Sequence, residues 1–252
     1  MSGRIDLNAD MGEGYGRWSI GNDAALLTHI TSANIACGMH AGDPDVMAQT
    51  MAAALEQGVN LGAHPGFPDI QGFGRRRMTL SETSLRNMIR YQLGAAAAMA
   101  RAAGGRLRHF KLHGALSNMA SEDATLARIC YETALDFDPD LVILILPLTA
   151  MEEVMQSLGG SWAGEIFADR AYNEDATLVD RSLPGAIIHD AGVAAANMAS
   201  MVREQAIICA SGKRLPCRID TICVHGDTPE SLEIAGAVRA RLEGEDYSVC
   251  PL

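Results

Sequence analysis

The stretches NIACGMHAGD (residues 34–43), NLGAHPGFPD (60–69), RHFKLHGALSN (108–118) and DTICVHGDTPE (220–230) share one pattern. In each, a short apolar run ends in a polar cluster that contains histidine. Two further stretches follow it without histidine, RIDLNADMGEG (4–14) and GEIFADRAYNED (164–175). A β/α barrel builds its site in this way, because strand residues fill the core while strand ends and the following loops present polar groups at one face.

Seven short segments have strand character, because each is apolar or alternating and is bounded by Gly, Pro or Asp. They are residues 3–8, 32–37, 59–63, 107–112, 141–146, 163–168 and 219–225. Helical stretches lie between them, at residues 44–58, 81–104, 122–136, 148–158, 191–210 and 229–243. This alternation predicts parallel strands with right-handed crossovers. We therefore expect an α/β protein with a single domain over residues 1–252, a seven-stranded parallel (β/α) barrel. A doubly wound open sheet is the alternative.

Capping signals support the helices. Asp43 is a suitable N-cap, Pro44 suits the first helical position and Gly58 suits the stop. Ser81 is a suitable cap for the next helix, and Thr228-Pro229 repeats the pattern of a cap followed by proline.

Two long loops, residues 64–77 and 169–190, lack helical character and are rich in polar residues. Long loops beside strand ends are often binding loops or lids. The first contains the run Arg75 to Arg77, which could clamp a carboxylate or a phosphate. A solvated charge run is the alternative interpretation.

The composition limits the function. With 252 residues, of which 48% are hydrophobic and 5% aromatic, the chain can bury a large core. The net charge of −11 argues against a nucleic-acid partner. No window approaches the roughly 20 apolar residues of a membrane span, and the N-terminus lacks the core of a signal peptide. We therefore expect a cytoplasmic protein with no membrane partner.

Several familiar site motifs are absent from the sequence. None of the six cysteines is paired as C-x-x-C, so a thiolate zinc site is not indicated. Gly212-Lys213 is followed by Arg and lacks the upstream Gly of a P-loop, and no G-x-S-x-G serine elbow occurs. Cys37 could be a nucleophile with His40 as its base, or simply a small buried residue.

Two strands carry polar residues at alternating positions. Asp6, Asn8 and Asp10 share one face of an extended strand, where polar groups need partners or a metal. Bracing by hydrogen bonds is the alternative for Asp6 and Asn8. Lys111 and His113 also face the same way, and a lysine inside a barrel is costly unless it meets an acid or an anionic ligand. His109 shares this alternation at the other strand end, which favours a structural role.

These motifs resemble the LamB/YcsF family. The matching segments are DLNADMGEG, SANIACGMHAGD, GAHPGFPD with GFGRR, KLHGALSN, EIFADRAY and TICVHGDTP. The resemblance extends from residue 3 to about residue 243. The resemblance implies a seven-stranded β/α barrel related to glycoside hydrolases and polysaccharide deacetylases. It also implies ATP-dependent opening of 5-oxoproline (pyroglutamate) to L-glutamate, together with two partner subunits, B and C. ATP with Mg²⁺ would be shared with these partners, because the chain has no P-loop.

The resemblance assigns site residues by position in these motifs. The catalytic set that it implies is Asp10, His40, His64, Lys111, His113, Asp169 and His225. The substrate-binding set is Asp6, Asn8, Glu13, Arg75, Asn118, Glu165, Arg170 and Asp227. Lys111 and Arg170 would bind the substrate carboxylate or a phosphate, and Asp10 with His40 or His64 would activate water. His113 and His225 are alternative general acids.

The chain departs from the family pattern at two positions. Leu112 and Ser117 replace the Pro and the Tyr of the usual Lys-Pro-His-Gly-x-Leu-Tyr-Asn. The loop is therefore expected to be less rigid, and a ring that could line the pocket is gone. The reaction class is consequently better indicated than the substrate.

Two other functions fit the same residues. One is a metal-dependent deacetylase or amidohydrolase acting on a cyclic amide or an N-acyl sugar, with Asp10, His40 and His64 around a divalent ion. The other is a non-catalytic subunit that only holds substrate. A homo-oligomer is compatible with the sequence.

Overall fold

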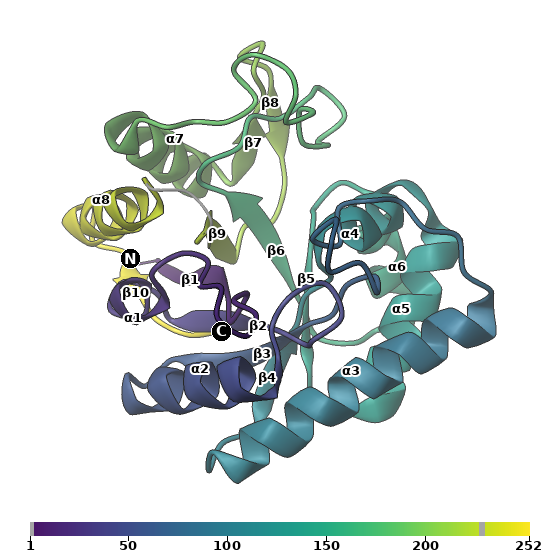
Figure 1. Cartoon of the computed structure of the whole chain (residues 1–252). Helices are drawn as coiled ribbons and strands as arrows, with labels where there is room; N and C mark the ends of the chain where they lie inside the picture. Colours follow the sequence, from purple (N-terminus) through teal and green to yellow (C-terminus); the bar gives the residue numbers. More distant parts are fainter. Residues whose placement is uncertain (1–2, 227–229) are drawn as a thin grey trace.

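A closed barrel of parallel strands organises the protein (Figure 1). The structure, a computed structural model, describes residues 3–226 and 230–252. The barrel strands are β1 (Arg4–Met11), β2 (Ser32–Ala36), β3 (Asn60–His64), β4 (Leu107–Phe110), β5 (Val142–Ile145), β6 (Trp162–Phe167) and β9 (Thr221–His225). Strand β9 pairs with both β6 and β1, which closes the barrel. The predicted barrel and its seven strands are confirmed, and the open sheet is wrong.

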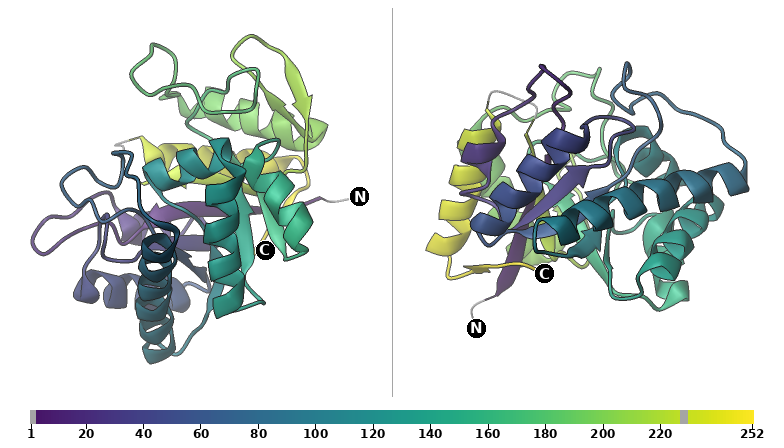
Figure 2. Two further views of the ribbon diagram at one scale, coloured as in Figure 1. Left: turned by 90° about the vertical axis from the view of Figure 1, so that its right-hand side faces the viewer. Right: turned by 60° about the horizontal axis from the view of Figure 1, so that its bottom comes forward.

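The helices cover the outside of the barrel (Figure 2). They are α1 (Asp23–Leu26), α2 (Pro44–Glu56), α3 (Glu82–Ala102), α4 (Gly114–Glu122), α5 (Ala124–Phe137), α6 (Ala150–Leu158), α7 (Ala191–Glu204) and α8 (Ser231–Gly244). No helix in the described part of the chain is both long and apolar enough to cross a membrane. A short strand β10 (Ser248–Val249) pairs with the start of β1, so the two described chain ends lie together.

The capping predictions hold where the structure describes them. Asp43 accepts hydrogen bonds from the backbone N–H groups of Asp45 and Val46 at the start of α2, and Ser81 accepts one from Ser84. Gly58 follows α2 with a φ of +71°, which only glycine adopts without strain. The predicted Thr228-Pro229 cap lies outside the described residues.

The structure differs from the prediction around α7 and α4. The helix predicted over residues 191–210 ends at Glu204, because Gln205 adopts a left-handed φ of +47°. An antiparallel hairpin follows, formed by β7 (Ala206–Ile208) and β8 (Arg214–Pro216). Helix α4 was not predicted, since no side-chain cap marks its start after His113 and Gly114 has a φ of +53°.

The two faces of β1 separate the apolar core from a polar barrel interior. Its apolar residues, Ile5, Leu7, Ala9 and Met11, are buried in the main hydrophobic cluster. Its alternate residues, Asp6, Asn8 and Asp10, are equally buried but make hydrogen bonds across the barrel. The shared face that alternation predicts for these three residues is therefore present.

Hydroxyl groups form hydrogen bonds with Asp6 and Asn8, which lie below Asp10 in the barrel. Asp6 accepts hydrogen bonds from Thr31 at 2.6 Å, from Ser32 at 2.7 Å and from Thr221. Burial raises the pKa of Asp6, and these hydrogen bonds oppose the rise. Asn8 donates to the Thr221 hydroxyl at 2.8 Å. Asp6 and Asn8 thus tie β1 to β9 at the closing seam of the barrel.

His109 also belongs to this polar network inside the barrel. Asn34 donates to Asn8 at 2.7 Å and to Asp10 at 2.9 Å, and its carbonyl oxygen is 2.8 Å from His109 Nε2. A Cβ atom on Gly62 would lie 2.0 Å from that Nε2, so β3 carries glycine there to admit the ring. His109 therefore has the structural role that the sequence favours.

Replacing Gly62 with alanine tests this packing. We expect Gly62→Ala to reduce the free energy of unfolding by about 1–3 kcal/mol, because the buried ring must leave its site and its hydrogen bond. Urea denaturation measures this quantity. Gly94→Ala, in α3 where nothing lies within 4 Å of the added Cβ, is the control, and we expect no loss of stability there. Equal effects of the two substitutions would contradict the packing argument.

Candidate functional site

A cavity of about 750 Å³ opens above the carboxyl ends of the strands. Its floor includes Asp10, Glu13, His64, Lys111 and His113. Its walls come from the two long polar loops and from α4, and include Arg75, Asn118, Arg170 and Arg181. The loops at residues 64–77 and 169–190 thus flank the site that the strand ends form.

Lys111 is the most strongly held charge of the floor. Its ammonium group lies 2.9 Å from Asp10 Oδ1 and 2.9 Å from Glu165 Oε1, and it donates to Cys223 Sγ at 2.9 Å. The residue is only 4% exposed. Burial by itself disfavours the ammonium form, but the neighbouring Asp10 and Glu165 carboxylates raise the pKa of Lys111 well above its ordinary value. The ammonium form is therefore fixed, and the buried lysine has the acids that its position requires.

Asp10 joins this charged group to the histidines. Its Oδ1 accepts from Lys111 and from Asn34, while its Oδ2 lies 3.3 Å from His64 Nε2. A carboxylate oxygen beside an imidazole, on the floor of a cavity, is suited to orienting or deprotonating a water molecule.

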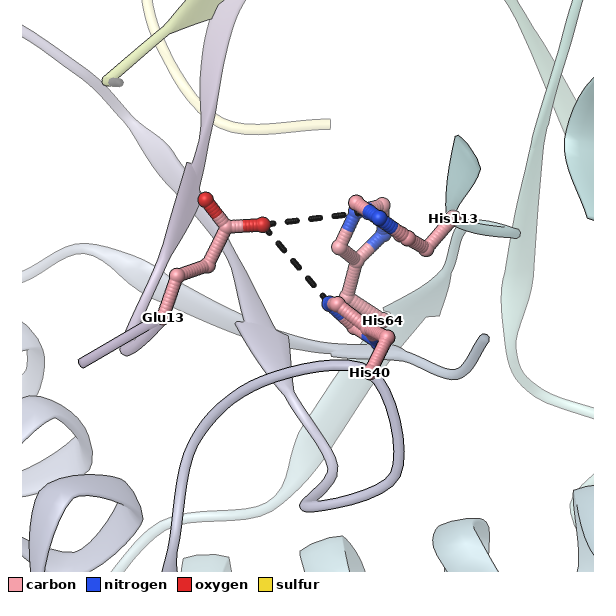
Figure 3. Close-up of side chains that lie close together, drawn as sticks. All are labelled: Glu13, His40, His64 and His113. Atoms are coloured by element: carbon pink, nitrogen blue, oxygen red, sulfur yellow. Dashed lines mark hydrogen bonds and ion pairs between the residues drawn. The ribbon is translucent and has the colours of Figure 1, made fainter. Parts of the chain in front are cut away.

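Four buried side chains converge beside Asp10: Glu13, His40, His64 and His113 (Figure 3). One ligand atom from each lies within 4.8 Å of all the others. Glu13 Oε1 is 3.6 Å from His40 Nε2 and 3.7 Å from His113 Nδ1. His64 is the last residue of β3, and the other three follow β1, β2 and β4, so four different strands place them. A group of this kind could hold a metal ion.

The sequence indicates Asp10, His40 and His64 as metal ligands only for the alternative function of a metal-dependent hydrolase. The structure keeps both histidines but adds Glu13 and His113 to the group. Asp10 is not a member, although its Oδ2 lies next to His64, and its Oδ1 is engaged by Lys111.

His40 and His113 are neutral near pH 7. Burial, followed by the charge of the neighbouring His64, lowers the pKa of His113 to about 3. Burial, followed by the charges of His113 and His64, also lowers the pKa of His40 well below its ordinary value. Neutral imidazoles act as bases or metal ligands, whereas a general-acid role for His113 would require the protonated form that burial disfavours.

Three arginines concentrate positive charge at the cavity wall. Arg170 is 7% exposed and donates to the Val179 carbonyl at 2.6 Å, but its buried Nε has no hydrogen-bond partner. Burial lowers the pKa of Arg170, and the nearby Arg181 and Arg75 act in the same direction. A carboxylate or a phosphate bound here would relieve this repulsion.

Some residues in the predicted sets lie away from the cavity. Asp6 and Asn8 are hydrogen-bonded below it, and Asp169 is buried without lining it. The charge of Asp169 acts on Arg170, whose pKa it raises. His225 ends β9, but the structure describes nothing of its side chain, and Asp227 lies outside the described residues.

The proposal of a Cys37 nucleophile is not supported. Burial raises the pKa of Cys37 to about 12, and its Sγ donates to the Ile35 carbonyl at 3.2 Å. The thiol is therefore protonated. Neither ring nitrogen of His40 makes a hydrogen bond, so His40 does not act on this thiol as a base.

Three contributors to the site were missed. The Phe73 carbonyl accepts from His113 Nε2 at 2.8 Å, Cys223 contacts Lys111, and Arg181 lines the wall. Alternation along β9 would have found Cys223, because it follows Thr221 on the inward face and pairs with Asn8. A backbone carbonyl in a loop carries no comparable signal.

The fold is that of the deacetylase-like (β/α) barrels. A family 4 carbohydrate esterase from Streptomyces lividans shares the fold at a TM-score of 0.51 and 14% identity, over 98% of this chain and 91% of that one. The chain belongs to the LamB/YcsF family, whose model matches residues 5–252. The resemblance read from the motifs is thereby confirmed.

Two relatives match almost the full length. The A subunit of 5-oxoprolinase from Ruegeria pomeroyi is 62% identical over 98% of this chain and 97% of its own. The lactam utilization protein from Thermus thermophilus has a solved structure that matches at a TM-score of 0.93 and 40% identity, over 99% of this chain and all (100%) of that one.

Stability should depend on pH through the buried histidine His109. Burial lowers its pKa from 6.5 to about 3 in the folded state, so the unfolded chain binds more protons between these values. The free energy of unfolding should therefore fall as pH falls from 6.5 towards 3, with His109 contributing up to about 1.4 kcal/mol per pH unit.

Urea denaturation at several pH values measures this slope. His109→Gln retains a donor for Asn34 and should show a shallower slope than the parent protein. His189→Gln, which changes an exposed ring, is the matched control and should leave the slope unchanged. An unaltered slope in His109→Gln would contradict the assignment.

Proposed function

We propose that this chain is the A subunit of an ATP-dependent 5-oxoprolinase. With partner subunits B and C it would open 5-oxoproline to L-glutamate, coupled to ATP hydrolysis. The observation that carries the proposal is the 62% identity, over nearly the full length of both chains, to a protein named as the A subunit of 5-oxoprolinase. The relation to a lactam utilization protein supports it, because 5-oxoproline is a lactam.

The chemistry of the reaction fits the cavity. A five-membered lactam is a poor electrophile, and reclosure of the ring is favoured because it is intramolecular. Phosphorylation of the amide oxygen makes the ring carbon electrophilic and turns that oxygen into part of a leaving group. A first water then attacks this carbon and breaks the carbon–nitrogen bond, which leaves an acyl phosphate and the free amine. A second water hydrolyses the acyl phosphate to the carboxylate and releases phosphate. The chain has no P-loop, so we assign the ATP and its Mg²⁺ mainly to the partner subunits.

The cavity wall would bind the anionic end of this substrate. 5-Oxoproline carries one carboxylate beside its ring, and Arg170 with Arg75 and Arg181 offers a cationic surface for it. Asn118 and Ser117 lie on the same lining, where they can hydrogen-bond to the ring. This arrangement directs the lactam group towards Lys111 and Asp10.

The floor would carry out the hydrolytic step. Lys111 remains an ammonium group and can stabilise negative charge on the lactam or phosphoryl oxygen. Asp10, beside His64, can take the proton of the attacking water. Glu165 holds Lys111 from below at 2.9 Å and so positions it.

The cluster of Glu13 with three histidines favours a second candidate function. This is hydrolysis of a cyclic amide or of an N-acyl sugar without ATP, assisted by a metal ion. A dependence of glutamate release on ATP separates the two functions.

Glutamate release from 5-oxoproline with ATP and Mg²⁺ tests the main proposal. We expect activity only when subunits B and C are added, and at least a hundredfold loss of kcat in Lys111→Met, because the fixed charge disappears. Retained activity in that variant would instead favour a subunit that only holds substrate. No activity in any mixture of folded proteins would overturn the substrate assignment.

The carboxylate site gives a separate prediction. Arg170→Lys keeps a positive charge but loses the planar guanidinium, so we expect KM for 5-oxoproline to rise roughly tenfold with a smaller change in kcat. Arg90→Lys is the matched control, since Arg90 is exposed on α3 and faces Asp136. An unchanged KM in Arg170→Lys would show that the carboxylate binds elsewhere.

A further inference from the structure

Two of the clustered histidines have their tautomers fixed by backbone carbonyl groups. His64 Nδ1 is 3.0 Å from the Lys111 carbonyl oxygen, and His113 Nε2 is 2.8 Å from the Phe73 carbonyl oxygen. A carbonyl oxygen only accepts hydrogen bonds, so each of these ring nitrogens must carry the proton. In a neutral ring, the other nitrogen then carries a lone pair.

Those two lone pairs face one another. His64 Nε2 and His113 Nδ1 lie 2.9 Å apart, which is a hydrogen-bonding distance between two atoms that are both acceptors. Two acceptors at this distance repel each other unless a cation lies beside both. The cation is either a proton, which would create a buried imidazolium, or a metal ion.

His40 supplies an independent observation. Its ring is fully buried, with 0% exposure, and neither of its nitrogens makes a hydrogen bond. Leaving a buried polar group without a partner is costly, and such groups in native proteins have a specific reason. Gly66 leaves room for this ring, because a Cβ there would lie 2.8 Å from His40 Nδ1, and Gly74 leaves room for the Cβ of His40 and for the ring of His113, each 2.7 Å away. The backbone therefore leaves room for a polar ring whose two nitrogens have no hydrogen-bond partner.

We propose that Glu13, His40, His64 and His113 bind one divalent transition-metal ion of the zinc type. Zinc bound at about 2.0–2.1 Å by nitrogen and oxygen places its ligand atoms about 3.3 Å apart in a tetrahedron. The observed separations of 2.9, 3.6 and 3.7 Å bracket that value. Three neutral imidazoles with a carboxylate form a ligand set for zinc and its neighbours rather than for Mg²⁺ or Ca²⁺.

The surroundings have the features of a metal centre. The carbonyl groups of Lys111 and Phe73 orient His64 and His113, as outer partners commonly orient metal-bound histidines. The ring of His40 stacks on that of His113 at 3.7 Å, so His40 must tilt to direct Nε2 towards the ion. A bound ion would act as a Lewis acid beside Asp10, within reach of the cavity.

This centre goes beyond the proposed function, and its test needs no substrate. The untagged protein is treated with a chelator, reloaded with Zn²⁺ or with Co²⁺, and dialysed. Metal content is then measured by mass spectrometry, and the visible spectrum of the Co²⁺ form is recorded. We expect about one ion per chain and a Co²⁺ spectrum of nitrogen and oxygen ligands without thiolate.

Two variants make the result specific. His113→Asn should weaken binding of Zn²⁺ at least a hundredfold, and Glu13→Gln, which keeps the size of the side chain, should weaken it at least tenfold. His189→Ala removes an exposed histidine and should bind as the parent does. Circular dichroism shows that each variant is folded, and a variant that is not folded is replaced by His40→Asn.

Three outcomes would overturn the proposal. One is a folded parent protein that takes up no ion at micromolar concentrations of Zn²⁺ or Co²⁺. Another is uptake that is unchanged in folded His113→Asn. The third is a Co²⁺ spectrum with thiolate character, which would place the ion on cysteine. Because metal uptake is measured without 5-oxoproline, ATP or subunits B and C, its failure is distinguishable from failure of the proposed function.

Discussion

One buried ammonium group, that of Lys111, constrains the rest of the site. A charge removed from water is tolerated only when opposite charges and hydrogen bonds replace its hydration. Asp10 and Glu165 meet this need directly, and Cys223 fills the remaining direction. Asn34 donates a hydrogen bond to Asp10, and the carbonyl oxygen of Asn34 is hydrogen-bonded to His109. A polar network therefore continues down the barrel to the hydroxyl groups around Asp6, while the apolar core lies outside the strands.

The floor and the wall of the cavity differ in charge. Its floor carries the carboxylates of Asp10 and Glu13 beside histidines, and its wall carries arginines, although the whole chain has a net charge of −11. A ligand with an anionic end and a neutral ring therefore has one favoured orientation, with the anion at Arg170 and the ring above the floor. Under the proposed function, the arginines that would bind the substrate lie on loops, and the residues that would carry out the chemistry lie at or near the strand ends.

The fold was predictable, whereas the grouping within the site was only partly so. Alternation along β1 and β4 identified the inward face, because side chains of a strand repeat every two residues. The sequence could not show that Lys111 pairs with one carboxylate oxygen of Asp10. Nor could it show that Glu13, which lies beyond the end of β1, contacts the histidines. Those contacts depend on barrel closure and on the Phe73 carbonyl, and carbonyl groups have no sequence signature. The thiol of Cys37 was ambiguous for a similar reason, since burial decides its pKa.

The seam between β1 and β9 has a consequence for biosynthesis. The hydrogen bond from Thr221 to Asp6 joins residues 215 positions apart, so the first strand of the barrel pairs with the last strand of the barrel. At about 5–20 residues per second, β1 waits roughly 10–40 seconds for that partner. During this time its inward acids and amides must remain hydrated, and no N-terminal fragment can close the ring. Contacts of such long sequence separation also slow folding, and the barrel is completed only after β9 has been synthesised.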